Sequence, residues 1–392
     1  ALALALLAGH VAARPALDGV RARLAGLENA LEDPASRTLS ARALLRDHGL
    51  DALADGLAAE ALRHETAGPG PSGAQPGQAQ AGIEDFRVAL ALLSQGYSTE
   101  DDADVLAAQG PHGPVALTFR GGTVTLADIR DAASRLVPDR AMRGDTLRLP
   151  LVLWADTRLV LAPGERLALG GADGAFILSL GRVEVDGAEI VADRARNPHS
   201  PEFVPFLAVA GGGALQMREA SVDGLGFGWT DKYAGVSVLG HPFMPSQGIT
   251  RIVRSRFESV VSLVIAGSDG AWLSDNRFHN VRDNALRLSR APDAVVSGNL
   301  FSGTAPTNAI RLLDRSDDVW LTGNVLLGGR RAGILVASGS DGAVLAGNVI
   351  WARAGGAIKF LRAACGRAER NIVLDGAQKG IEVRASPGTA VR

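Results

Sequence analysis

Positively charged side chains recur at a fixed interval in the last third of the chain. Arg287, Arg311 and Lys359 take the same place in three copies of one short phrase. An arginine guanidinium binds a carboxylate through two parallel hydrogen bonds, whereas a lysine ammonium acts as a point charge. Cations repeated in this way could bind a chain of anionic groups. We assign substrate binding to these three residues and to four others: Arg290, Arg362, Lys232 and His199.

Proton transfer at a carbon next to a carboxylate needs a base, together with a cation that neutralises the carboxylate. Candidate bases are His241, in the loop formed by residues 240–248, and Tyr233, in a short segment that gathers aromatic and charged groups. His199 is a third candidate. A lone histidine in a loop is more often a surface residue than a catalyst, so both roles stay open for His241.

The acidic residues do not indicate a metal site. Asp and Glu are scattered along the chain, and no pair of His or Cys residues has the spacing of zinc ligands. The clustered carboxylates that calcium sites require are missing from the sequence. We therefore expect no metal and no cofactor.

The cations belong to a repeat that indicates the fold. The central aliphatic residue of the phrase recurs at intervals of 24, 24, 24 and 23 residues. A repeat of this length, with strands of about four to six residues that alternate apolar and polar side chains, fits one coil of a parallel β-helix. The five copies are Asn284 to Leu288, Asn308 to Leu312, Ala332 to Val336, Gly356 to Phe360 and Lys379 to Val383.

Side chains within each copy must alternate between the two faces of the strand. Leu286, Leu288 and their counterparts are predicted to fill the interior, while Arg287 and its counterparts point outward. Asparagine tolerates left-handed backbone angles, and its amide can bind the same residue one coil away. We therefore predict a structural role for a second column that runs in step: Asn276, Asn299, Asn324, Asn348 and Asn371.

Changes in composition divide the chain into segments. The opening residues are apolar and are followed by small residues, as in a signal peptide, and they are too few to span a bilayer. A run of Pro, Gly, Gln and Ala is typical of a linker. The predicted segments are 1–13 (signal-peptide remnant), 14–65 (helical region), 66–82 (flexible linker), 83–142 (helical segment with a capping strand and helix) and 143–392 (β-helix).

The predicted cap lies within residues 83–142. We expect a helix over Ile83 to Leu93 and a strand over Val115 to Phe119. Thr125 can cap a further helix over Leu126 to Leu136, with Asp128 in its first turn. This helix would cover the open end of the solenoid and keep its strand edges from pairing with other chains.

Composition limits the function classes. The formal net charge is −2 over 392 residues, so the overall charge does not favour nucleic acid as a partner. The one cysteine, Cys365, excludes an internal disulfide, and we predict that it is buried. Together with the signal-like opening residues, the near absence of cysteine favours a bacterial protein that is periplasmic or secreted, and no membrane span is expected.

The spacing between coils bears on the ligand. Adjacent strands lie about 4.8 Å apart, close to the length of one sugar unit in an extended polysaccharide. Stacking Arg287 on Arg311 costs roughly 1 kcal/mol in water, and an anion along the groove would relieve this repulsion. We therefore expect a polysaccharide with one carboxylate per sugar. The alternative is a solvated basic face whose local partners are Asp314, Asp317 and Asp318.

The order of these parts resembles a known family. A capping strand and helix precede the coils, and the phrases Pro201 to Leu207 and Tyr233 to Val238 come before the regular repeats. Over about residues 113–392, this order is similar to the periplasmic mannuronan C5-epimerases of bacterial alginate systems. The resemblance implies a mainly β chain, a right-handed parallel β-helix and a groove for an anionic polyuronate.

The chain also departs from that family. The family's Asp-Pro-His-Asp motif, whose His is the catalytic base, is replaced here by Arg287-Leu288-Ser289-Arg290. Its charge-neutralising arginine falls near Arg315, to which the resemblance assigns a catalytic role.

Three hypotheses stay open: an epimerase, or less readily a lyase, with a relocated base; a polysaccharide-binding protein without catalysis; and a structural β-helix whose N-terminal helices dock a partner. The expected partners are an anionic polysaccharide and other exopolysaccharide secretion proteins.

Overall fold

The computed structural model describes residues 13–33, 41–52, 54–55, 77–244, 246–303 and 305–392. The predictions for residues 1–12 and 66–76 fall outside this range. No helix of the described chain is both long and apolar enough to span a membrane. The helices are α2 (Ala13–Leu31), α3 (Ala41–Asp47), α5 (Arg87–Ser94), α6 (Asp102–Ala107) and α7 (Leu126–Leu136), with short 3-10 turns η2 (Gly110–His112), η3 (Pro138–Arg140) and η4 (Asp231–Tyr233).

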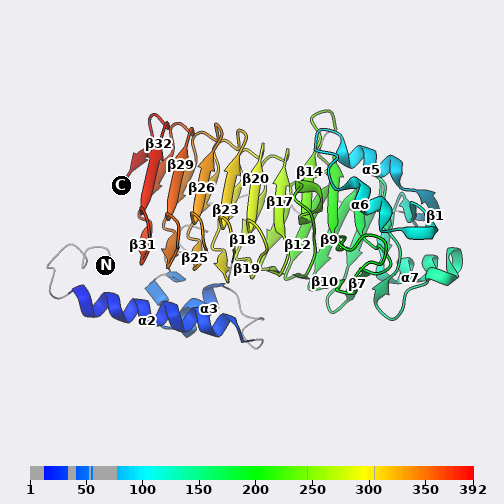
Figure 1. Ribbon diagram of the computed structural model, residues 1–392, viewed down its shortest axis with the longest axis horizontal. Helices are drawn as coiled ribbons and strands as arrows, with labels where there is room; N and C mark the ends of the chain where they lie inside the picture. Colours follow the sequence, from blue (N-terminus) through cyan, green and yellow to red (C-terminus); the bar gives the residue numbers. More distant parts are fainter. Residues whose placement is uncertain (1–12, 34–40, 53, 56–76, 245, 304) are drawn as a thin grey trace.

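Strands make up three sheets that run the length of the molecule (Figure 1). Sheet I contains β1 (Gln80–Asp85), β2 (Val115–Arg120), β5 (Leu151–Leu153), β8 (Ile177–Ser179), β11 (Leu207–Gly211), β14 (Gly235–Gly240), β17 (Ser262–Ala266), β20 (Leu286–Ser289), β23 (Ile310–Leu313), β26 (Ile334–Ala337), β29 (Ile358–Leu361) and β32 (Ile381–Arg384). Sheet II contains β4 (Thr146–Leu147), β7 (Arg166–Gly170), β10 (Glu189–Asp193), β13 (Ser221–Asp223), β16 (Arg256–Glu258), β19 (Arg277–His279), β22 (Leu300–Ser302), β25 (Val325–Leu327), β28 (Val349–Trp351) and β31 (Ile372–Leu374). Sheet III contains β3 (Thr123–Thr125), β6 (Arg158–Leu161), β9 (Arg182–Asp186), β12 (Ala214–Arg218), β15 (Arg251–Val253), β18 (Trp272–Ser274), β21 (Val295–Ser297), β24 (Trp320–Thr322), β27 (Val344–Ala346), β30 (Arg367–Glu369) and β33 (Ala390–Val391).

Successive strands pass from one sheet to the next, and each pairs in parallel with the strand one coil later. β20 pairs with β23, for example, so that Leu286 faces Ile310 and Arg287 faces Arg311. This topology confirms the predicted right-handed parallel β-helix and the register expected from the repeat.

The interior is a continuous apolar core. The predicted inward residues of the repeat are fully buried from Leu286 to Phe360. Three phenylalanines on sheet II stack one above another, with ring centroids 5.0 Å apart between Phe257 and Phe278 and 4.8 Å between Phe278 and Phe301. In the last coil Val383 is 43% exposed, because no coil of the described chain lies beyond it.

The asparagine column has the predicted structural role. The Nδ2 of Asn299 donates to Oδ1 of Asn324 at 2.9 Å, and Asn324 donates in the same way to Asn348. Left-handed backbone angles, however, fall on the residue before each asparagine, such as Gly298 and Gly323. The expectation that asparagine itself takes the left-handed angle was therefore wrong. The preceding residue takes that angle, and the asparagine amide stabilises the bend through hydrogen bonds.

The N-terminal end of the solenoid is capped. Helix α7 begins after Thr125, whose hydroxyl and backbone exchange hydrogen bonds with Asp128, and its apolar face joins the core. Strand β1 pairs antiparallel with β2, so the edge of the first parallel strand of sheet I is covered. Two predictions fail here. Gln80 to Gly82 belong to β1 rather than to the linker 66–82, and the helix expected from Ile83 begins only at Arg87.

The N-terminal helices lie along sheet II (Figure 1). Leu24, Leu27 and Leu31 of α2 are buried against outward apolar side chains of sheet II. Arg21 also forms an ion pair with Asp375 at 2.8 Å. The apolar stripe of α2 therefore packs on the solenoid itself, so it offers no open surface of the kind that would favour the partner-docking hypothesis.

The exposure of Cys365 contradicts the prediction that this residue is buried. The thiol is free and exposed, on a residue with φ of 56° between β29 and β30. Its place on a corner of the coil, rather than in a strand, explains why periodicity did not predict its burial correctly.

Candidate functional site

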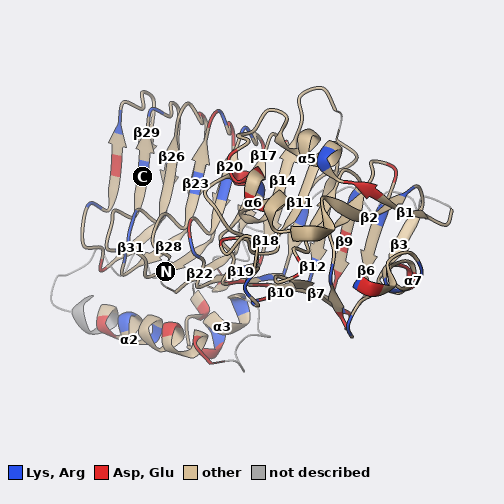
Figure 2. Ribbon diagram, turned by 45° about the vertical axis from the view of Figure 1, so that its right-hand side comes forward, with Lys and Arg blue, Asp and Glu red and all other residues tan. Residues whose placement is uncertain are grey.

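The predicted row of outward side chains runs along sheet I. Parallel pairing aligns each member with the next, and the basic segments on β20, β23 and β29 are visible in Figure 2. The row reads Val264, Arg287, Arg311, Leu335, Lys359 and Glu382.

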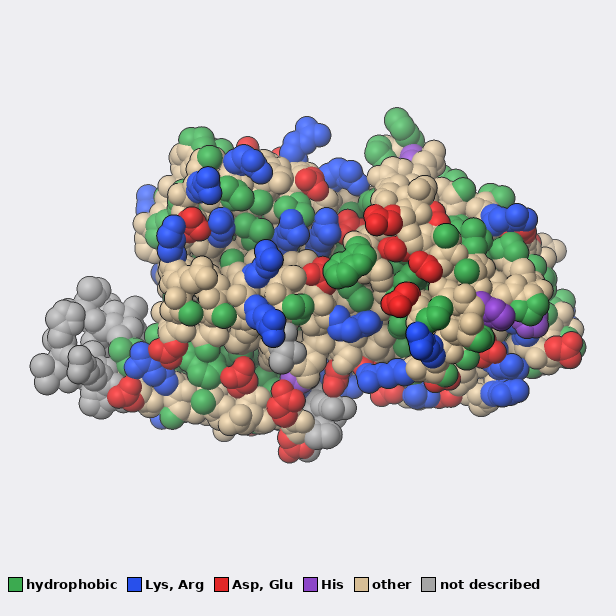
Figure 3. All heavy atoms as spheres, viewed as in Figure 1, with side chains coloured by type: hydrophobic (Ala, Val, Ile, Leu, Met, Phe, Trp, Pro, Cys, Tyr) green, Lys and Arg blue, Asp and Glu red, His purple; other side chains and the backbone are tan. Residues whose placement is uncertain are grey.

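Two hollows lie along this row. The first, of about 320 Å³, is lined among others by Glu202, Trp229, Asp231, Arg282, Asp283 and Arg287. The second, of about 400 Å³, is lined among others by Arg330, Arg331, Leu335, Lys359, Lys379 and Glu382. Arg311 stands on the row between them. We call the row and its two hollows the basic groove. Figure 3 shows Lys and Arg side chains gathered over the C-terminal coils of this face, with acidic groups nearer its middle.

Arg287 has an acidic partner. Its Nη1 lies 2.9 Å from Oδ1 of Asp231, and the two side chains keep 26% and 18% of their surface exposed. The Nε of Arg287 is buried without a hydrogen-bond partner. One edge of this guanidinium is thus occupied, while another of its donors is unused.

Arg311 lacks such a partner. It forms no ion pair with any described residue, and its buried Nε has no hydrogen-bond acceptor. Burial lowers the pKa of its guanidinium, and the neighbouring charge of Arg287 lowers it further. A half-buried cation with an unused donor is unfavourable until an anion binds it.

Asp231 was not predicted as a site residue. It lies in η4, and its backbone oxygen accepts a hydrogen bond from the hydroxyl of Ser237 on β14. Burial raises the pKa of its carboxyl, and the charge of Arg287 partly offsets this rise. The sequence gathers aromatic and charged groups in residues 229–233 but does not indicate which of them faces the groove.

Three of the other predicted cations stand at the edges of the groove. Arg290, Arg315 and Arg362 have positive φ angles and lie on the corner after the sheet I strands, not on the strand face. Arg290 packs over the ring of Tyr97, 5.4 Å from its centroid. Lys359 forms an ion pair with Glu382 at 3.3 Å. Only Arg287, Arg311 and Lys359 share the strand face.

Lys232 and Tyr233 lie in a buried cluster instead of in the groove. Both are fully buried, and both donate hydrogen bonds to the carboxylate of Asp102 on α6. Lys232 also donates to Oγ of Ser94, at 2.8 Å. Burial lowers the pKa of Lys232 and raises that of Tyr233. The cluster holds α5 and α6 on the solenoid, and neither Lys232 nor Tyr233 lines the two hollows of the basic groove.

The two predicted histidines lie away from the basic groove. His241 begins the loop between β14 and β15, and its Nδ1 accepts a hydrogen bond from the backbone of Phe243. His199 is exposed and lies beside Gly110 of η2. Neither lines the two hollows of the groove, so no predicted base is brought next to Arg287 and Arg311.

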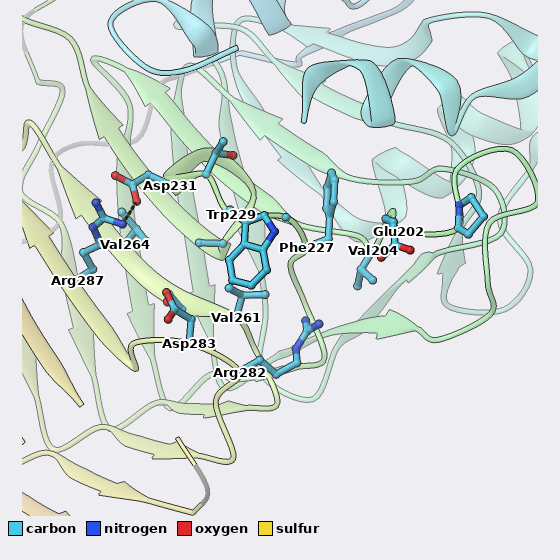
Figure 4. Close-up of a pocket in the computed structure, with 15 residues that line it drawn as sticks. Glu202, Val204, Phe227, Trp229, Asp231, Val261, Val264, Arg282, Asp283 and Arg287 are labelled. Atoms are coloured by element: carbon cyan, nitrogen blue, oxygen red, sulfur yellow. Dashed lines mark ion pairs between the residues drawn. The ribbon is translucent and has the colours of Figure 1, made fainter. Parts of the chain in front are cut away.

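Figure 4 shows the end of the groove near β14. Asp231 points toward Arg287, Asp283 lies below it, and the indole of Trp229 projects between these residues and Glu202. Asp283 accepts hydrogen bonds from Thr307 at 3.0 Å and from Asn284 at 2.8 Å. Carboxylates therefore face the arginines in this part of the groove, a feature that the sequence did not reveal.

Solved structures with a similar fold provide a comparison. A double mutant of the periplasmic alginate epimerase AlgG superposes with a TM-score of 0.63 at 15% identity, over 82% of this chain and 83% of that chain. Unsubstituted AlgG gives 0.57 at 14% identity, over 82% and 95%. The chain has the β-helix fold of AlgG. A single mutant of AlgG covers 86% of this chain and 97% of its own, with a TM-score of 0.58 at 14% identity.

A family model described as periplasmic copper-binding protein (NosD) matches residues 249–390, which form the C-terminal coils of the solenoid. The comparison with curated proteins finds no match. Copper sites in proteins use His, Cys and Met ligands. Residues 249–390 contain one His, one Cys and no Met, and the described residues hold no group of three acidic, His or Cys side chains arranged for a metal. His279 and Cys365 lie on different coils, so this donor set does not fit copper.

Proposed function

We propose that the basic groove binds an anionic, uronate-containing polysaccharide, and that Arg311 is its principal carboxylate receptor. The observation that carries this proposal is the unpaired guanidinium of Arg311, half-buried on a strand face and stacked on Arg287. A carboxylate there would supply the missing acceptor and offset the repulsion between the two arginines.

The repeat explains why a polymer suits this groove better than a single anion. Arg287 and Arg311 lie on adjacent parallel strands about 4.8 Å apart, and Lys359 lies two coils beyond Arg311, with Leu335 between them. Sugar units of similar length would bring successive carboxylates over successive coils. The AlgG-like fold supports the same ligand class, since AlgG is an alginate epimerase, and it supports a periplasmic or secreted location.

Catalysis is a second candidate function, favoured by Asp231. Its carboxylate lies in the groove against Arg287, and its raised pKa suits a group that exchanges protons near neutral pH better than an ordinary aspartate would. In an epimerase of this kind the C5–H bond breaks, its proton passes to Asp231, and Arg311 stabilises the enolate that forms at the substrate carboxylate. A water molecule on the other face protonates C5 to complete the inversion, and the hydroxide that remains takes up the proton held by Asp231. Without this step, the groove binds the polymer and leaves it unchanged.

Binding is tested with polymannuronate and the full chain. Arg311→Ala should weaken binding at least tenfold, since it removes the unpaired receptor. Arg367→Ala is the matched control: Arg367 is an exposed arginine on sheet III, and its loss should change the affinity less than twofold. Equal losses in the two variants, or no binding by the wild type at low salt, would overturn the proposal.

Catalysis is tested separately in heavy water. Proton NMR of polymannuronate should show deuterium entering at C5 and guluronate signals, and both should disappear with Asp231→Asn. If the wild type binds the polymer but leaves its C5 protons unexchanged, the protein is a polysaccharide-binding protein without this activity.

A further inference from the structure

The most exposed large aromatic side chain of the described residues lies at the acidic end of the basic groove. The side chain of Trp229 is 89% exposed and lines the first hollow together with Asp231, Asp283 and Arg287. Burying an indole contributes more apolar contact area than almost any other side chain, so such exposure beside a groove points to a ligand.

The indole stands on a fixed support. The backbone N–H of Trp229 donates to Oδ2 of Asp101 at 3.1 Å, and the N–H of Phe227 donates to the backbone oxygen of Tyr233 at 2.9 Å. Gly228 has a φ of 67°, and a Cβ there would come within 2.3 Å of the Asp101 carboxylate. Beneath the loop, the rings of Phe227 and Tyr233 stack with centroids 5.2 Å apart. The exposed ring is thus presented by a well-packed loop.

The charges around Trp229 differ from those of the arginine row. Glu202, Asp231 and Asp283 all line this hollow. Of its two cations, Arg287 is paired with Asp231, and Arg282 donates to the backbone oxygens of Leu225 and Gly226. This end therefore offers acceptors for hydroxyl groups and would repel a carboxylate.

We infer that Trp229 is the stacking platform of a distinct sugar subsite at the end of the groove. One pyranose ring lies with its apolar C–H face on the indole, and its hydroxyls donate hydrogen bonds to the carboxylates of Asp283 and Glu202. The carboxylates of the polymer stay on the arginine row. This inference rests on the proposed function and adds a subsite that recognises the ring, not the charge, of a sugar.

Affinity for an oligomannuronate of about six sugars tests the subsite. Trp229→Ala should weaken binding about tenfold, and Trp229→Phe should lose less, since a smaller aromatic face remains. The salt dependence of binding should stay as in the wild type, because no ionic contact is removed, whereas Arg311→Ala should reduce it. Phe243→Ala is the control, an equally exposed aromatic (88%) on the loop after β14 that does not line either hollow.

Tryptophan fluorescence gives a second readout. Saturating oligomannuronate should protect the wild type from quenching by acrylamide, and the Trp229→Phe variant should lose most of that protection. If Trp229→Ala binds like the wild type while Arg311→Ala loses binding, the subsite is overturned and the proposed function stands. If the wild type binds no oligomannuronate, the proposed function itself is overturned.

Discussion

Oδ1 of Asp231 lies 2.9 Å from Nη1 of Arg287, although Asp231 precedes β14 and Arg287 lies on β20, two coils away. The carboxylate of Asp231 thereby occupies the position that a ligand carboxylate would take on Arg287. Arg311, on the next coil, has no such internal partner among the described residues. The two stacked arginines are therefore unequal: one is held by the protein, and the other is available to a ligand.

This inequality predicts a pH dependence of binding. Because the pKa of Asp231 is raised, its carboxyl takes up a proton at a higher pH than an ordinary aspartate and then releases Arg287. Uronate carboxyl groups, whose pKa is not raised by burial, are still ionised there. Affinity for oligomannuronate should therefore rise as pH falls toward the pKa of Asp231. Calorimetric titration at constant ionic strength measures this rise.

Asp231→Asn is the matched variant for that effect. The variant should bind oligomannuronate about three- to tenfold more tightly at neutral pH and lose the pH dependence, because Arg287 is then free at every pH.

The stability of Asp231→Asn should also change in a defined direction. Because the pKa of Asp231 is higher in the folded protein than in the unfolded chain, folding disfavours its ionised carboxyl. The free energy of unfolding of the wild type should therefore fall as pH rises through the folded pKa. The Asp231→Asn variant should show no such fall. Weaker binding by Asp231→Asn would contradict the interpretation.

The asparagine column should carry measurable stability. Oδ1 of Asn324 accepts hydrogen bonds from the backbone and the side chain of Asn299, and its Nδ2 donates to Val296 and Asn348. Asn324→Ala leaves these buried groups unpaired, so we expect a loss of about 3 kcal/mol in the free energy of unfolding. Asn371→Ala, at the partly exposed end of the column, should cost about 1 kcal/mol. Chemical denaturation measures both losses of unfolding free energy. Equal losses in the two variants would contradict a larger contribution from the buried members of the column.

The buried cluster around Asp102 should respond asymmetrically to substitution. Asp102→Ala leaves the fully buried ammonium of Lys232 without its counter-charge, which costs about 3 to 5 kcal/mol. Lys232→Met should cost less, because Asp102 is partly exposed and still accepts a hydrogen bond from Tyr233. Thermal unfolding of the two variants at neutral pH provides the comparison, and the reverse order would show that Asp102 is not the principal partner of Lys232.

Docking of α2 on sheet II can be separated from ligand binding. Leu27→Ala removes a buried side chain at that contact, with an expected cost of about 2 to 4 kcal/mol. Amide hydrogen exchange over Ala13–Leu31 should become faster, while affinity for oligomannuronate stays unchanged, because the basic groove lies on sheet I. Asn29→Ala, at an exposed position of the same helix, is the control and should alter neither quantity.

Sequence reasoning predicted the features that depend on periodicity. The register of Arg287 with Arg311 follows from strict alternation, since a slip of one residue would turn Leu286 and Leu288 outward. The helix after Thr125 follows from its cap, which is a local signal. Cys365 and Arg290 were harder to place, because they lie on corners where alternation stops.

Contacts between distant segments could not be predicted in this way. Nothing near Lys232 and Tyr233 indicates that Asp102, from a separate helix, will cover them. The same holds for Asp231 against Arg287. One signal in the sequence does indicate a covered face: the outward positions of sheet II are apolar, as expected for strands covered on both faces, at Leu300, Val325, Val349 and Ile372.

The regular register also limits how such a chain can change in evolution. A gain or loss of one residue within a strand would misalign the asparagine column, the apolar interior and the arginine row at the same time. Duplication or deletion of a whole coil leaves all three continuous. We therefore expect descendants of this chain to vary in length by steps of about 24 residues, each step lengthening or shortening the groove by about one sugar unit.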